Sequence, residues 1–154
     1  MISIIVTLTK YMLIVLMIMY TSQCFSVFSK KKEKARRRVL RRQITLIISV
    51  LTTAFLAMFL QTMDQRVLLL YGATLVYIVL TQLLYRAIYK KASILLLNNM
   101  CMLITIGIII LTRLNTALAM KQLFLVSGAT LLSLLVPVIV RKVKIIRDLT
   151  WVYA

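Results

Sequence analysis

The sequence predicts an all-α polytopic membrane protein with about five transmembrane helices and its N-terminus outside the cell. Of its 154 residues, 62% are apolar and only 15% are charged, far from the balance of a soluble globular domain. The apolar residues fall into five stretches of 18 to 21 residues, close to the ~20 helical residues that cross a ~30 Å hydrocarbon core. Lys and Arg gather in alternate connecting segments, which is typical of a chain that crosses a membrane repeatedly.

The stretches are expected to be helices because lipid offers no partners for backbone N–H and C=O groups. Only α-helices and closed barrels satisfy those groups internally. A barrel needs shorter strands that alternate in hydrophobicity, whereas these stretches are continuously apolar. The predicted helices are, in chain order, Tyr11–Phe28, Ile44–Thr62, Val67–Tyr85, Ala92–Thr112 and Leu123–Val140.

The first predicted helix has the length of a secretory signal peptide, but its charges are arranged the other way round. Only Lys10 precedes its apolar part, and the basic cluster follows it. We therefore expect a retained helix. The cluster before the second helix, in residues 29–43, holds nine of the 20 Lys and Arg residues: Lys30, Lys31, Lys32, Lys34, Arg36, Arg37, Arg38, Arg41 and Arg42.

The distribution of positive charge predicts the orientation. Sixteen of the 20 Lys and Arg residues lie in 29–43, in 86–91 and after Val140, and four lie elsewhere. Cytoplasmic loops retain positive charge, so these three segments are expected inside. We interpret 29–43 as a topogenic anchor that also attracts anionic lipid, by ~1 kcal/mol per residue near the surface. Docking of an acidic partner is an alternative. Nucleic acid is disfavoured because the run has no aromatic residue to stack on bases.

Polar and small residues inside the fourth and fifth predicted helices indicate contacts between helices. Asn98 and Asn99 are expected to hydrogen-bond across helices, with a substrate or ion pathway as the alternative. A second set consists of small residues that would let helix backbones approach closely. Its members are Gly107, Gly128, Ala129 and Ser133.

The composition gives little material for catalysis or metal binding. The chain has no His, only three acidic residues and two cysteines far apart in sequence. A paired-carboxylate mechanism needs two acids that converge on one site. Glu33 and Asp148 fall in basic cytoplasmic segments, and Asp64 is expected outside, in a tight turn. We therefore predict no catalytic residue, no metal site and no cofactor in this chain.

Residues 102–115 read MLITIGIIILTRLN, and residues 119–122 read AMKQ. This block resembles the opening of the FtsW/RodA/SpoVE (SEDS) family, in which a first core helix carrying a Gly ends in a Thr-Arg-Leu-like step. A short external loop then leads through a Lys/Arg-Gln pair into the second core helix. Asn115 stands where relatives often have an acid. The segments RKVKIIR (141–147) and LTWVYA (149–154) continue the resemblance.

The resemblance covers about residues 95–154 and divides the chain in two. Residues 95–154 would be the start of a SEDS-like membrane core. Residues 1–94 would be an additional three-helix membrane module with its basic loop inside. The family's presumed catalytic Asp lies in a large external loop much further along, so the chain is expected to be a fragment of a longer protein that is inactive by itself.

The resemblance implies a peptidoglycan glycosyltransferase of the bacterial plasma membrane, which polymerises lipid II in division, elongation or sporulation. The partners it implies are a class B penicillin-binding protein and other divisome or elongasome proteins. Candidate contacts to the lipid donor are Arg113, Lys121 and Gln122, although anchoring of helix ends at the interface would also explain them. Two other functions stay open: a small transporter or flippase subunit, and a non-enzymatic membrane scaffold. A transporter needs a charged residue inside its spans, and apart from Lys10, near the outer end of the first, the spans of this chain offer none.

Overall fold

The computed structural model describes residues 2–29, 33–88 and 93–142, and every element within these ranges is an α-helix. The helices are α1 (Ile2–Ser29), α2 (Glu33–Thr62), α3 (Gln65–Ile88), α4 (Ile94–Leu114) and α5 (Thr116–Lys142). Each of the five is long and apolar enough to cross a membrane. The predicted all-α polytopic membrane fold is therefore confirmed.

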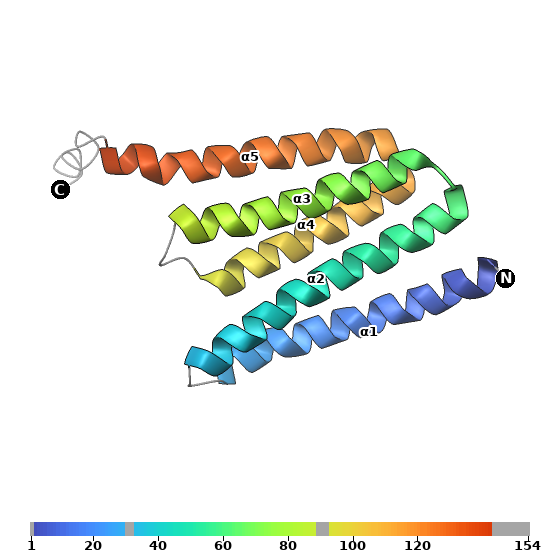
Figure 1. Cartoon of the computed structure of the whole chain (residues 1–154), viewed down its shortest axis with the longest axis horizontal. Helices are drawn as coiled ribbons and strands as arrows, with labels where there is room; N and C mark the ends of the chain where they lie inside the picture. Colours follow the sequence, from blue (N-terminus) through green and yellow to red (C-terminus); the bar gives the residue numbers. More distant parts are fainter. Residues whose placement is uncertain (1, 30–32, 89–92, 143–154) are drawn as a thin grey trace, which may run out of the picture.

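The helices lie side by side and alternate in direction along the chain (Figure 1). Helix α1 forms one edge of the bundle and packs mainly on α2. Helix α2 also packs on α3 and α4, and both of these pack on α5 at the other edge. Because each connection is short, α3 and α5 run in the same direction and lie next to one another.

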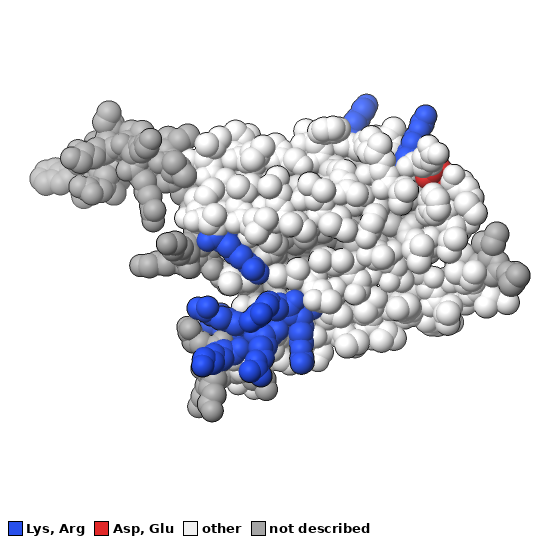
Figure 2. Space-filling model, in the orientation of Figure 1, with Lys and Arg blue, Asp and Glu red and all other residues white. Residues whose placement is uncertain are grey.

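The two ends of the bundle differ in charge. One end, here called the basic end, holds the last turns of α1 and α3 and the first turns of α2 and α4. Lys and Arg side chains gather there over the start of α2 (Figure 2). The other end, here called the opposite end, holds the α2–α3 turn at residues 63–64 and the α4–α5 junction at Asn115. By the positive-inside rule the basic end is expected to face the cytoplasm.

Three helices begin about two or more turns earlier than the hydropathy pattern predicts. Helix α1 begins at Ile2 instead of Tyr11, and α5 begins at Thr116 instead of Leu123. Helix α2 has 30 residues and includes the basic run from Lys34 onward. These added segments contain no Gly or Pro, so nothing in them opposes helix formation. At ~1.5 Å per residue, α2 exceeds the ~30 Å hydrocarbon core, and its first turns extend beyond it.

The core of the bundle lies around α2, α3 and α4. Their largest fully buried side chains include Ile47, Leu51, Leu70, Ile78 and Ile108. In α2, 39% of the most apolar window is buried, against 6% in α1 and 17% in α5. The two edge helices therefore present most of their apolar surface to lipid.

The small residues of α4 and α5 require a correction. Gly107, Gly128 and Ala129 are exposed, and a Cβ added at either glycine would meet no atom within 4 Å. Among the described helices these residues do not form the predicted close contacts. The physical reason is the rotation of each helix about its axis. In α4 the buried face carries Thr105 and Ile108, and Gly107 lies off that face. Ser133 is also exposed, but its hydroxyl oxygen lies 3.3 Å from the Tyr85 hydroxyl oxygen of α3.

Candidate functional site

The three candidate lipid-donor residues lie at the opposite end of the bundle. Arg113 is in the last turn of α4, and Lys121 and Gln122 are in the second turn of α5. All three side chains are exposed. Between them Asn115 ends α4 and starts α5. Its backbone N–H donates to the Leu111 carbonyl over 2.8 Å, and its Oδ1 accepts the Ala117 N–H over 2.9 Å. The junction thus holds these four polar side chains at one end of the bundle.

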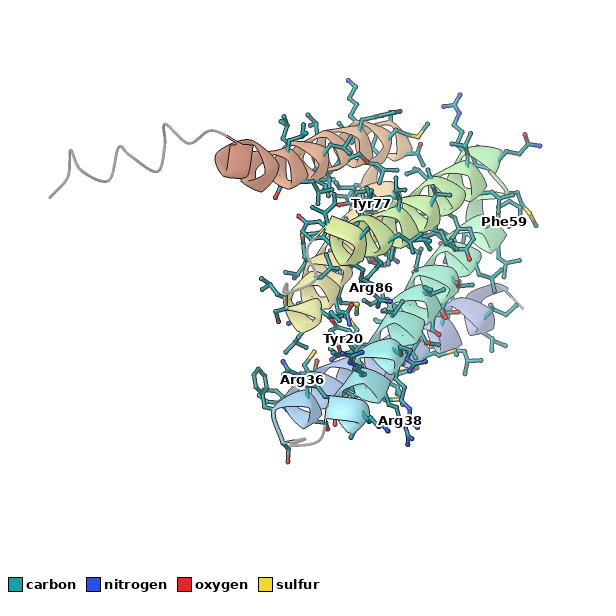
Figure 3. The ribbon with its side chains drawn as sticks, turned by 60° about the vertical axis from the view of Figure 1, so that its left-hand side comes forward. Tyr20, Arg36, Arg38, Phe59, Tyr77 and Arg86 are labelled. Atoms are coloured by element: carbon teal, nitrogen blue, oxygen red, sulfur yellow. The ribbon has the colours of Figure 1, made fainter. Side chains whose placement is uncertain are left out.

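The described residues of the basic run form one exposed surface at the start of α2. Figure 3 shows Arg36 and Arg38 on the first turns of this helix. Arg86, near the end of α3, is exposed at the same end of the bundle. The described side chains of the run are all exposed: Lys34, Arg36, Arg37, Arg38, Arg41 and Arg42. Lys30, Lys31 and Lys32 lie outside the described residues.

Asn98 lies at the centre of a buried polar cluster within the basic half of the bundle. Its side chain is fully buried. Its Nδ2 donates to the Leu40 carbonyl over 3.1 Å and to Gln43 Oε1 over 3.0 Å. Its Oδ1 accepts a hydrogen bond of 2.8 Å from Gln82 Nε2. One amide therefore joins α4 to both α2 and α3.

Asn99 extends the cluster to α1. Its Oδ1 accepts a 2.8 Å hydrogen bond from the Tyr20 hydroxyl and a 3.3 Å contact from Cys24 Sγ. Gln43 Nε2 in turn lies 3.5 Å from Cys24 Sγ. Four helices thus share one network of hydrogen bonds. The buried polar side chains among the described residues are amides and hydroxyls, and none carries a formal charge.

This network crosses the predicted division of the chain at residues 94 and 95. Helix α4 belongs by resemblance to the second segment, yet its asparagines bond to α1, α2 and α3. The described helices therefore form one bundle, and the division remains a prediction about sequence relationship.

Sequence reasoning missed Gln43, Gln82 and Tyr20 as members of the cluster. A signal was present, because Gln82 is an amide within a predicted apolar span and Gln43 adjoins one. Amides at such positions seek partners on other helices, since lipid supplies none. The pairing itself could not be predicted because it depends on the rotation of four separate helices.

The described residues contain no group of His, Cys, Asp or Glu that could hold a metal ion. Cys24 and Cys101 are both free thiols. Asp64 is at the opposite end, in the α2–α3 turn, where its Oδ1 accepts the Arg66 backbone N–H over 2.9 Å and starts α3.

An apolar groove of about 400 Å³ lies between α3 and α5. Tyr77 lies between these helices in Figure 3, and its hydroxyl is 2.8 Å from Thr130 Oγ1. The residues that line the groove come from both helices: Leu69, Ala73, Val76, Tyr77, Leu80, Thr81, Leu84, Met120, Leu123, Phe124, Ser127, Thr130 and Leu131.

Comparison of the chain with models of known protein families, with curated proteins and with solved structures finds no match.

Proposed function

We propose that the chain is the N-terminal membrane part of a SEDS-type peptidoglycan glycosyltransferase in a bacterial plasma membrane. The observation that carries the proposal is the block from Met102 to Gln122, with its Thr-Arg-Leu step and its Lys-Gln pair. The fold supports it, because this block covers the end of α4 and the start of α5, two membrane-length helices joined by a short junction at the end away from the basic loop. The resemblance implies a short external loop between two core helices. Here that loop is reduced to Asn115, and Lys121 and Gln122 lie within α5.

In this proposal the α4–α5 junction faces the side on which lipid II is polymerised. Arg113 and Lys121 would attract the pyrophosphate of the lipid donor, and Gln122 would donate a hydrogen bond to it. Their exposure at one interface supports this role, since an interfacial cation attracts an anionic lipid by ~1 kcal/mol. By the resemblance, the family's catalytic Asp belongs to an external loop much further along than the matched block. A class B penicillin-binding protein is the proposed partner, in division, elongation or sporulation.

The test begins with the DNA that follows the codon for Ala154. The proposal expects an open frame that encodes further apolar spans and a long external loop with an acidic residue. A stop codon directly after Ala154 would contradict it. Purified and reconstituted, the 154-residue chain should leave lipid II unpolymerised. If this chain alone formed polymer, its own residues would carry out the catalysis, although they include no pair of acids. The proposal would then be wrong.

A second function is favoured by the exposed basic surface of α2. In that case the protein is a non-enzymatic membrane scaffold, and the cations from Lys34 to Arg42 dock acidic partners. Replacing the nine basic residues of 29–43 by Gln separates the possibilities. Loss of partner recovery with unchanged topology supports the scaffold. Inverted topology supports a topogenic anchor.

A further inference from the structure

We infer that the groove between α3 and α5 holds one hydrocarbon chain of an anionic phospholipid, whose phosphate lies at the opposite end of the bundle between Arg66 and Lys121. The inference concerns a membrane lipid and does not depend on the proposed glycosyltransferase role.

The groove has the size and length of a site for one hydrocarbon chain. Its volume of about 400 Å³ lies within the range of small-molecule pockets. Its lining on α3 extends from Leu69 to Leu84, about 22 Å at ~1.5 Å per residue. That length exceeds the ~15 Å thickness of one leaflet, which is half of the ~30 Å hydrocarbon core. A single chain can therefore lie along it.

Two hydroxyl groups of the groove, those of Tyr77 and Thr130, are already paired with protein atoms. Tyr77 and Thr130 pair with each other across the two helices, and the Thr130 hydroxyl also donates to the Val126 carbonyl over 2.7 Å. A ligand that needed hydrogen bonds inside the groove would gain few there. Hydrocarbon needs none, and its dispersion contacts with Leu, Val and Phe side chains suffice.

Each helix carries a cation where the groove begins. Arg66 lies one turn before Leu69, the first lining residue of α3, and Lys121 directly follows Met120, the first lining residue of α5. Residues three apart lie on the same side of a helix. Because α3 and α5 both start at the opposite end, Arg66 and Lys121 lie at the same interface, and both side chains are exposed. Asp64 caps α3, since its carboxylate accepts the Arg66 backbone N–H.

The groove reaches the opposite end of the bundle on both helices. Its lining begins at Leu69 on α3 and at Met120 on α5, close to the first turn of each helix. Arg86 lies at the other end of α3, beyond Leu84, and is therefore a control cation away from the proposed headgroup position.

The inference is tested with the full 154-residue chain in mild detergent, titrated with phosphatidylglycerol or phosphatidylcholine and examined by native mass spectrometry. We expect preferential retention of one phosphatidylglycerol. Arg66→Gln and Lys121→Gln should each weaken that retention about fivefold, the equivalent of ~1 kcal/mol per cation. Arg86→Gln should leave it unchanged. If Arg86→Gln weakens retention and the other two substitutions do not, the headgroup lies at the basic end and the inference is wrong.

A second pair of variants tests the groove itself. Ser127→Phe fills it, and Ala129→Phe adds the same bulk to an exposed position on the same helix. The inference expects loss of the retained lipid only in Ser127→Phe, with the helical circular dichroism of both variants unchanged. Equal retention in the two variants would overturn it. Conversion of a dimer to a monomer by Ser127→Phe would assign the groove to a second copy of the chain and would also overturn it.

Discussion

Asn98 shows how one polar side chain can set the relative positions of several membrane helices. Its amide makes hydrogen bonds to the Leu40 carbonyl, Gln43 and Gln82, and it is fully buried. In lipid the packing of apolar side chains provides little directional preference, because the tails are as apolar as leucine. The directional contacts of Asn98 therefore contribute strongly to the rotation and register of α2, α3 and α4.

Replacing Asn98 by Leu is expected to lower the free energy of unfolding by about 1–3 kcal/mol, because Gln43 and Gln82 would keep buried amide groups without that partner. Unfolding by SDS in mixed micelles, followed by circular dichroism, measures the change. Gln122→Leu is the control, since Gln122 is exposed on α5 and surface changes usually stay within about 0.5 kcal/mol. Equal stability of the two variants would show that the buried cluster does not hold the helices together.

Asn115 acts at the scale of one residue but defines where two helices meet. It ends α4 through its backbone N–H and caps α5 through its side chain. Asn115→Ala should destabilise the protein by about 0.5–2 kcal/mol, because the first turn of α5 loses its cap. Asn115→Asp should retain stability, since Asp caps equally well. Faster amide hydrogen exchange at Ala117 in Asn115→Ala, and not in Asn115→Asp, checks the cause. Unchanged exchange in both would contradict it.

At the scale of whole elements, α2 is the central helix and α1 is peripheral. Leu51 of α2 is fully buried, whereas Leu56 on the same helix is 57% exposed. The difference follows from rotation of the helix about its axis, because both residues belong to one continuous apolar stretch. Hydropathy treats the two leucines alike.

Leu51→Ala is expected to lower the free energy of unfolding by about 1–2 kcal/mol, which is the cavity part of the ~2–5 kcal/mol seen for buried Leu→Ala changes in water-soluble cores. The transfer part is small here, since the unfolded helix leaves its leucine in lipid. The same SDS titration measures the change, and Leu56→Ala is the matched control with no expected effect. A larger loss in Leu56→Ala would contradict the burial of α2.

At the scale of the whole molecule, the separation of charge between the two ends predicts the orientation in the membrane. Arg36 lies at the basic end and Lys121 at the opposite end, and both side chains are exposed. Since cytoplasmic segments retain positive charge, Arg36 is expected inside the cell and Lys121 outside.

Cysteine labelling of intact cells tests this orientation. A membrane-impermeant maleimide should label Lys121→Cys and fail to label Arg36→Cys. The wild-type chain gives the background, because Cys101 is buried and Cys24 lies within α1. Labelling of Arg36→Cys should appear only after the cells are opened. Labelling of Arg36→Cys from outside would show that the predicted orientation is wrong. The α4–α5 junction would then lie inside the cell.

The sequence predicted where many of the candidate residues lie along the helices. It predicted few of the contacts that they make with one another. Arg113, Lys121 and the basic run could be placed at helix ends, because apolar spans and charged flanks are read directly along the sequence. Gly107 and Gly128 were expected at contacts and are exposed, since small size permits close packing without requiring it. Gln43 and Gln82 were missed because a polar residue in a span has several possible partners.

The sequence by itself determined that the chain forms apolar helices of membrane length, and it placed positive charge at one end of them. Both properties depend only on which residues follow one another along the chain. A long apolar stretch must be helical in lipid to satisfy its backbone hydrogen bonds, and Lys and Arg are favoured in cytoplasmic loops. Only the tertiary structure decided which face of each helix is buried, which amides pair around Asn98, and that α3 and α5 enclose a groove. These depend on rotations and separations between helices, which short-range contacts set in three dimensions.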